Sequence, residues 1–269
     1  MLEPIPPVAP RVRPASHLAR NLPPSAARDW LAAGWSDLRA SPVQSLVYGL
    51  AVFALSVLVI LGLVAVGLPS LILPALSGFL VVGPLLAIGL YEKSRRLRAG
   101  HAVALGRMIV AYPRSGGQLA YAGLLLCLLV VLWLRAADLL YALFFGLVPF
   151  PGFDQILSQL FTTPRGWALI LTGSAVGGLF AAFAMAISLF SIPMLLERRV
   201  DALTALGTSF MLTTQNLRAV LPWGAIVVAG FVLSAATGLL GLIVIFPLLG
   251  HGTWHAWVAL RPGAVEPDE

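Results

Sequence analysis

The sequence predicts an all-α membrane protein, built as a bundle of six transmembrane helices. Of its 269 residues, 59% are hydrophobic and only 10% are charged, which is too little polar surface to cover a soluble particle of this size. The apolar residues gather in long segments, and the length of each segment is close to the roughly 20 residues that a spanning helix needs. Polar and apolar residues do not alternate through these segments with a barrel period, so transmembrane strands are excluded.

We expect the spans at residues 43–67, 69–91, 118–134, 167–196, 219–235 and 239–257. A turn-like Gly-Leu-Pro-Ser sequence at 67–70 separates the first two spans, which therefore form a helical hairpin, and the last two pivot on Gly238. The fourth span is longer than the roughly 30 Å hydrocarbon core requires, so it must tilt or protrude.

Three of the spans end in a similar signature, Pro-Leu-Leu or Pro-Met-Leu, with the proline at Pro84, Pro193 and Pro247. A short amphipathic stretch precedes the first, third and fifth spans; we expect the second of these helices over residues 101–112. The pattern predicts a pseudo-threefold repeat of an interfacial helix plus a helical hairpin, with units at about 30–100, 101–200 and 201–258. Each proline removes a backbone donor and should kink its helix. The alternative is a coincidence of Pro-Leu pairs in a chain rich in both residues.

The two ends of the chain are expected to lie outside the bundle. Residues 1–29 are rich in Pro and Arg and lack a long apolar run, which predicts a disordered cytoplasmic tail and excludes a cleaved signal peptide. Residues 30–258 form the single membrane domain, and residues 259–269 form a short acidic tail. The one cysteine, Cys127, lies within a span and cannot form an internal disulfide.

The basic residues predict the orientation in the membrane. Of the 17 Lys and Arg residues, only Arg135 and Arg165 fall on the far side of the predicted spans. Because Lys and Arg near span ends are retained in the cytoplasm, both termini are predicted to be cytoplasmic. The net charge of +6 is explained by the basic residues that set the orientation of the spans during membrane insertion. It does not indicate a nucleic-acid partner. The lipid bilayer is the expected partner, and a second copy of the chain or another membrane subunit is an open alternative.

One basic stretch follows the second span and contains Lys93, Arg95, Arg96 and Arg98. We interpret these side chains as membrane-interface residues that anchor the bundle and contact lipid headgroups. Regulation through anionic lipids at the same residues is the alternative.

The fourth span carries small residues every four positions, which predicts close helix packing. The two rows are Gly173, Gly177, Ala181 and Ser174, Gly178, Ala182, Ala186. Packing inside one chain and packing between two copies both fit this pattern.

His251 and His255 are the candidate metal ligands, because a spacing of four places both imidazoles on one helix face. A third ligand could come from Glu92 or Glu197, at corresponding ends of the second and fourth spans. Structural histidines at the membrane interface are the simpler interpretation, and a haem role is a further alternative. The sequence requires no cofactor, and it contains no catalytic motif, so we expect that the protein is not an enzyme.

Three segments together resemble the DUF2189 family of predicted bacterial integral membrane proteins. They are residues 34–39, residues 78–96 and residues 247–257, and the resemblance extends from Trp30 to Trp257. It implies a six-span protein of the bacterial inner membrane whose function is uncharacterised.

Two classes of function fit the sequence. The first is a non-enzymatic bundle of the inner membrane, acting as a transporter-like protein or as a scaffold. The spans are almost free of ionisable residues, which disfavours a proton-coupled pump. The alternative is a metal- or haem-handling accessory protein that uses the His251 and His255 end of the last span.

Overall fold

The computed structural model describes residues 18–110, 113–146 and 151–263, and all regular structure within them is helical. The helices are α1 (Ala26–Ala40), α2 (Pro42–Ala65), the 3-10 turn η1 (Pro69–Leu71), α3 (Ile72–Leu86), α4 (Ile88–Arg98), α5 (Leu105–Ile109), α6 (Gly116–Phe145), α7 (Phe153–Thr162), α8 (Pro164–Ser188), α9 (Ser191–Glu197), α10 (Ala202–Gln215), α11 (Leu217–Ala236) and α12 (Leu242–Leu260).

Within the described residues, six helical segments are long and apolar enough to cross a membrane, which confirms the expected number of spans. They are Pro42–Ala65, Pro69–Arg98, Gly116–Phe145, Pro164–Glu197, Leu217–Ala236 and Leu242–Leu260. The third span is longer than predicted because α6 continues through Arg135 and Asp138, which form an exposed pair 3.4 Å apart on adjacent turns. No internal repeat is detected in the described chain, so the threefold repeat stays a prediction.

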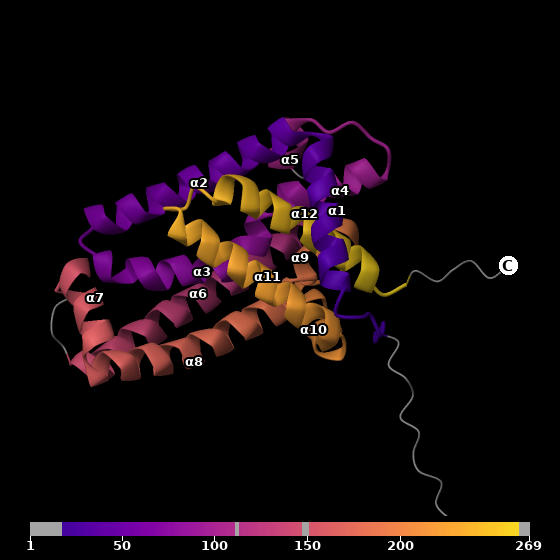
Figure 1. Cartoon of the computed structure of the whole chain (residues 1–269). Helices are drawn as coiled ribbons and strands as arrows, with labels where there is room; N and C mark the ends of the chain where they lie inside the picture. The colour runs from indigo at the N-terminus through magenta and orange to yellow at the C-terminus, as the bar shows by residue number, and fades with distance from the viewer. Residues whose placement is uncertain (1–17, 111–112, 147–150, 264–269) are drawn as a thin grey trace, which may run out of the picture.

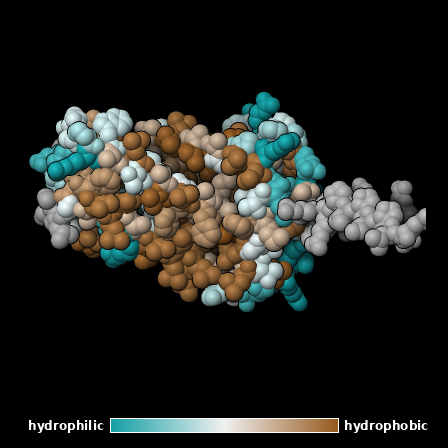
Figure 2. Space-filling view, turned by 90° about the horizontal axis from the view of Figure 1, so that it is seen from below, coloured by the Kyte–Doolittle hydropathy of each residue, from teal (hydrophilic) through white to brown (hydrophobic). Residues whose placement is uncertain are grey.

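The long helices lie side by side, and the short ones cap the two ends of the bundle (Figure 1). Helices α1, α4, α5 and α10 gather at one end, which we call the basic end, and α7 lies at the other. A broad apolar band separates two ends with polar side chains in the view of Figure 2. Many apolar side chains of the spanning helices stay exposed, among them Leu58, Leu139 and Leu179, as expected of surfaces that face lipid.

The helices pack as two groups. The first group is centred on α12, which contacts α1, α2, α4 and α11; the second is centred on α8, which contacts α3, α6, α7 and α10. The second span belongs to both, because its α3 part packs on α6 and α8 whereas its α4 part packs on α12.

Glycines allow α12 to approach its neighbours closely. A Cβ added at Gly34 of α1 would lie 2.6 Å from the backbone nitrogen of Gly252, and one added at Gly49 of α2 would collide with the carbonyl of Ile243. Beside this contact the rings of Trp30 and Trp223 meet edge to face, with centroids 6.0 Å apart. The amphipathic helix α1 is therefore packed into the bundle along one face.

Two spans are interrupted near the basic end, and side chains from neighbouring helices bond the backbone there. Between α3 and α4, the Tyr48 hydroxyl donates to the carbonyl of Leu86 (2.7 Å) and accepts from the amide of Gly89 (3.3 Å). Between α8 and α9, the Ser209 hydroxyl accepts from the amide of Phe190 (3.1 Å) and donates to the carbonyl of Ala186 (2.8 Å). Such bonds are needed because a break within the bilayer frees polar groups that lipid cannot satisfy.

The three signature prolines occupy different positions relative to these breaks. Pro84 lies in α3 three residues before Ala87, where the span is interrupted; Pro193 lies in α9, after the second break; and Pro247 lies inside the continuous helix α12.

The N-terminal segment departs from the prediction of a disordered tail over residues 1–29. Leu18 is buried, and the side chain of Asn216 binds both the carbonyl of Leu18 (2.9 Å) and the amide of Arg20 (2.8 Å). Helix α1 already begins at Ala26. Hydrogen bonds to the side chain of Asn216, at the corner between α10 and α11, therefore hold the start of this segment in place, and residues 1–17 lie outside the described part.

Two smaller boundaries also differ from expectation. The interfacial helix expected over 101–112 is limited to Leu105–Ile109, and residues 111–112 lie outside the described part. The last span continues to Leu260, and of the predicted acidic tail only residues up to 263 are described.

Candidate functional site

A cluster of polar side chains is buried where α1, α2, α4 and α12 meet at the basic end. We call it the polar cluster; its members are Asp37, Ser45, Lys93, Ser94, His251 and His255. Ser45, Lys93 and His251 have no exposed surface. Buried polar groups of this kind persist only when they are hydrogen-bonded.

Lys93 lies inside the bundle because its ammonium group has two acceptors there. Its Nζ donates to the carbonyl of Ser41 at 2.7 Å and to the hydroxyl of Ser45 at 2.6 Å. Ser41 and Ser45 are at the junction of α1 and α2, so Lys93 ties α4 to the start of the first span.

His251 sits between two serine hydroxyls. Its Nε2 is 2.9 Å from Ser45 Oγ, and its Nδ1 is 2.8 Å from Ser94 Oγ. A neutral imidazole donates from one nitrogen and accepts at the other, so both of its hydrogen-bonding positions are used. The side chain joins α2 to α4 through α12.

The outer part of the polar cluster contains a carboxylate. Asp37 Oδ2 is 2.9 Å from His255 Nε2, which joins α1 to α12. Burial by itself would raise the pKa of Asp37, but hydrogen bonds from His255 and Ser94 outweigh it and hold this pKa below its ordinary value of 3.8. The carboxylate is therefore charged at neutral pH.

The described geometry gives little support to a metal site at His251 and His255. Within the described residues, no group of three or more His, Cys, Asp or Glu side chains is arranged to hold a metal ion. Glu92 pairs with Arg95 at 2.6 Å, and Glu197 accepts from Trp257 at 2.8 Å. Each ring nitrogen of His251 contacts a serine hydroxyl, so whichever nitrogen bound a metal would first have to leave its serine partner.

The predicted lipid-contacting residues divide into two kinds. Lys93 is buried in the polar cluster and does not reach the membrane surface, contrary to our expectation. Arg95 and Arg96 are half-buried, and Arg98 is exposed at the end of α4. Of the four predicted residues, the three arginines therefore have surface that lipid headgroups can reach, and Lys93 has none.

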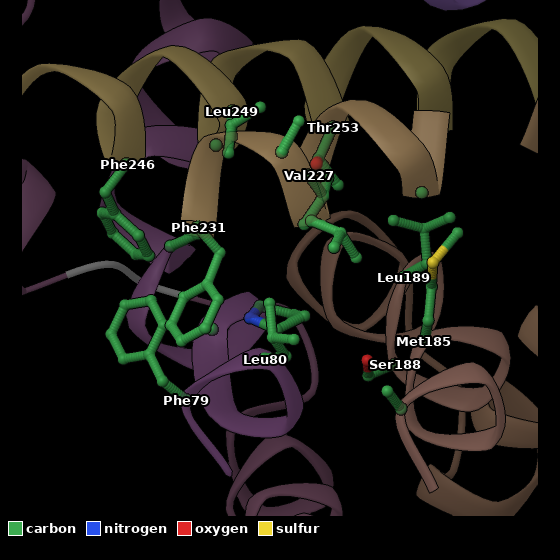
Figure 3. Close-up of a pocket in the computed structure, with 18 of the residues that line it drawn as sticks. Phe79, Leu80, Met185, Ser188, Leu189, Val227, Phe231, Phe246, Leu249 and Thr253 are labelled. Atoms are coloured by element: carbon green, nitrogen blue, oxygen red, sulfur yellow. The ribbon is translucent and has the colours of Figure 1, made fainter. Parts of the chain in front are cut away.

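A first cavity of about 600 Å³ lies between the two groups of helices, bordered by α3, α8, α11 and α12. Phe79, Phe231 and Phe246 line one end, and Met185, Ser188 and Leu189 line the other (Figure 3). Its lining is almost entirely apolar. The residues at its rim, among them Ala182 on α8 and Leu221 and Val228 on α11, are exposed. The cavity therefore opens sideways, toward the bilayer.

A second cavity of about 780 Å³ lies nearer to α7, between α3, α6 and α8. It includes Trp133, whose indole nitrogen donates to the carbonyl of Pro74 (3.0 Å) and to Ser77 (2.9 Å). Four residues border both cavities: Leu80, Gly178, Ala181 and Val228. The cavities thus adjoin along one face of α8.

Six of the seven small residues singled out on the fourth span line one or both cavities, and Ala186 lines neither. The six are Gly173, Ser174, Gly177, Gly178, Ala181 and Ala182. Of these, Gly177 packs tightly, since a Cβ there would lie 2.8 Å from the ring of Trp133. A Cβ at Gly178 would meet open space. On this face of α8 the small side chains mostly border open space. The sequence predicts close contact with another helix here.

Several residues of the polar cluster and the cavities carry no motif in the sequence. Ser45, Ser94 and Asp37 have ordinary local sequence, and only the fold brings them to His251. A serine inside an apolar span is a weak indication of a buried polar site. Ser45 and Ser188 are both serines of this kind.

This arrangement, six apolar spans with a cavity open to lipid, is that of a multi-pass integral membrane protein. Residues 71–197 match the model of DUF2189, a family of predicted integral membrane proteins. The match confirms the resemblance from α3 to α9, whereas we expected it to extend from Trp30 to Trp257. No curated protein and no solved structure matches the chain.

Proposed function

We propose that this protein is a non-enzymatic bundle of the bacterial inner membrane that takes up a lipid-soluble solute from the bilayer. The observation that carries the proposal is the first cavity, which is apolar, lies between two helix groups and opens sideways. Its size is within the range of about 300–1,000 Å³ typical of small-molecule sites. An aqueous solute would find almost no polar group along this route.

The breaks in the second and fourth spans support movement of one helix group against the other. The second span changes its packing partners at its break near Ala87, from α6 and α8 to α12. After its break near Leu189, the fourth span keeps its contacts with α6 and α10 and also contacts α4 and α12. Interrupted spans are common where membrane proteins move solutes, because a break provides a hinge. We infer that the solute passes between the first and second cavities along the small residues of α8.

The proposal includes the orientation and the repeat. The positive charge at the basic end favours a cytoplasmic location for that end and for both termini. A C-terminal green fluorescent protein fusion should then fluoresce, and alkaline phosphatase fused after Gly146 should be active; the reverse pattern contradicts the orientation.

A short helix, α1, α5 or α10, precedes each pair of spans, which supports a threefold organisation.

The lipid-soluble solute is favoured over metal or haem handling. Both nitrogens of His251 are bonded to serines, so the polar cluster is better suited to holding α1, α4 and α12 together. Elemental analysis and an absorption spectrum of the purified protein, beside a His251→Ala/His255→Ala double variant, test the alternative. About one metal or haem per chain, lost in the double variant, would favour it.

Photolabelling tests uptake from the bilayer. A photoreactive long-chain alkyl probe, added to the protein in lipid nanodiscs, should label peptides that line the first cavity. Gly178→Leu fills space that borders both cavities and should remove this labelling, since a Cβ there meets nothing within 4 Å and the fold should survive. Gly62→Leu is the matched control, because Gly62 is also helical and unobstructed but borders neither cavity. Equal labelling in both variants contradicts uptake into the cavity.

A further inference from the structure

We propose that the first cavity binds a neutral single-chain lipid whose one carbonyl or hydroxyl oxygen is held by Ser188. The inference rests on the proposed function and adds the chemical class of the solute and the residue that selects it.

Ser188 is a buried hydroxyl that has no partner in the described structure. The side chain has no exposed surface, its Oγ makes no hydrogen bond, and the residue lines the first cavity beside Met185 (Figure 3). A serine in a helix usually bonds its own preceding turn, as Ser234 does with the carbonyl of Gly230 at 2.8 Å. A buried hydroxyl without a partner is costly, and a ligand oxygen at this position would satisfy it.

The position of Ser188 follows from the break between α8 and α9. Ser188 is the last residue of α8, and Ser209 and Thr213 of α10 both bond the carbonyl of Ala186. These hydroxyls of α10 satisfy the backbone at the break but leave the side chain of Ser188 unused. The break thus presents the hydroxyl of Ser188 to the cavity, whose lining also includes Tyr91, Thr253 and the already bonded Ser234.

The remaining lining determines which head group fits. Among the described residues around this cavity there is no Asp, Glu, Lys, Arg or His. A carboxylate or a phosphate would therefore enter without a counter-charge, which is unfavourable in a dry apolar site. A neutral oxygen needs only the one hydrogen bond that Ser188 can donate.

The opposite end of the cavity suits a hydrocarbon. Phe79 stacks on Phe231 with centroids 6.3 Å apart and meets Phe246 edge-on at 5.6 Å. These rings provide an apolar wall away from Ser188 (Figure 3). A lipid with its oxygen at Ser188 would place its chain along this wall and reach the bilayer between α8 and α11.

Competition photolabelling in lipid nanodiscs tests the assignment. The probe is a long-chain alcohol that carries a diazirine and an alkyne, and the competitors are an alcohol, an alkane and a fatty acid of equal chain length. For the wild type, the alcohol should compete about fivefold to tenfold better than the alkane, the value of one hydrogen bond. The fatty acid at neutral pH should compete no better than the alkane.

Two serine variants separate the hydroxyl from the cavity. Ser188→Ala should bind the alcohol and the alkane equally and still be labelled. Ser234→Ala is the matched control, because Ser234 lines the same cavity but its hydroxyl is already bonded, so it should keep the wild-type preference.

The possible failures are distinguishable. Equal competition by alcohol and alkane in the wild type, preference retained in Ser188→Ala, or stronger competition by the fatty acid would each overturn this inference. If one of these results were found but cavity labelling were still lost in Gly178→Leu, the proposed uptake would stand without the role of Ser188. Absence of cavity labelling by any probe would overturn both.

Discussion

His251 on the last span and Ser45 on the first lie 206 positions apart in the sequence, and their side chains are joined by a buried contact of 2.9 Å. Together with Lys93 and Ser94, this pair fastens the first and last spans to the end of the second. The polar cluster therefore closes the bundle at its basic end, while the apolar cavities leave it open within the membrane.

Replacing His251 by Ala should lower the free energy of unfolding by about 3 kcal/mol, because it leaves a void and removes one hydrogen-bond partner from each of Ser45 and Ser94. The measurement is thermal unfolding in a mild detergent. His101→Ala is the control, since His101 is exposed and its loss should change little. Equal, small effects of both variants would show that the polar cluster contributes little to stability.

Acid should weaken the contact between α1 and α12 through Asp37. The pKa of this carboxyl is held below 3.8 in the folded protein, so its stabilising effect is complete above that pH and is lost as the pH falls through the lower, folded value. Asp37→Asn should be less stable than the wild type at neutral pH and should lose less stability below about pH 4.

Unfolding measured across pH 2–7 checks this dependence. Asp29→Asn is the control: Asp29 lies on the same helix but is exposed, so this variant should keep the acid loss of the wild type. An Asp37→Asn profile parallel to that of the wild type would contradict the assignment.

Gly34→Ala should separate α1 from α12, because the new methyl group would overlap the backbone at Gly252. Overpacking of this kind costs about 1–3 kcal/mol, and here both partners are backbone atoms that cannot move aside easily. Limited proteolysis near α1 should become faster. Gly106→Ala, where a Cβ meets open space, should behave as the wild type; cleavage at equal rates in both variants would argue against close packing of α1.

Tyr48→Phe removes the hydroxyl that bridges the break in the second span. The carbonyl of Leu86 and the amide of Gly89 then lose a partner, so we expect a loss of about 1–3 kcal/mol in unfolding free energy. Tyr121→Phe, at an exposed position on α6, should be neutral. Hydrogen exchange at Gly89 offers an independent measurement, and unchanged protection there would contradict the bridging role.

The sequence predicts the membrane architecture well because hydropathy alone decides it. Six apolar segments appear where expected, with ends shifted by a few residues at most places. The larger differences arise where tertiary contacts decide. The side chain of Asn216 orders residues that composition assigned to a tail. The difference at the third span is local instead, since α6 continues past its predicted end through Arg135 and Asp138, which lie on its surface and pair with each other.

The candidate site is less predictable because it depends on which helices face each other. His251 is visible in the sequence, but its partners Ser45 and Ser94 come from other spans and have no motif. Lys93 illustrates the difficulty, since a lysine within a basic run predicts a surface residue, yet its side chain is buried and bonds Ser41 and Ser45. Small residues on α8 are equally ambiguous in sequence, because the same pattern can bring helices together or leave a cavity.

The most direct test of the central claim, uptake of a lipid-soluble solute into the first cavity, is mapping of probe-labelled peptides in lipid nanodiscs. Uptake into the cavity should place labels on peptides from α8, α11 and α12 around Met185, Val227 and Leu249. These labels should be lost in Gly178→Leu and retained in Gly62→Leu. Labels confined to outward-facing positions such as Leu139 and Leu179, unchanged by Gly178→Leu, would contradict it.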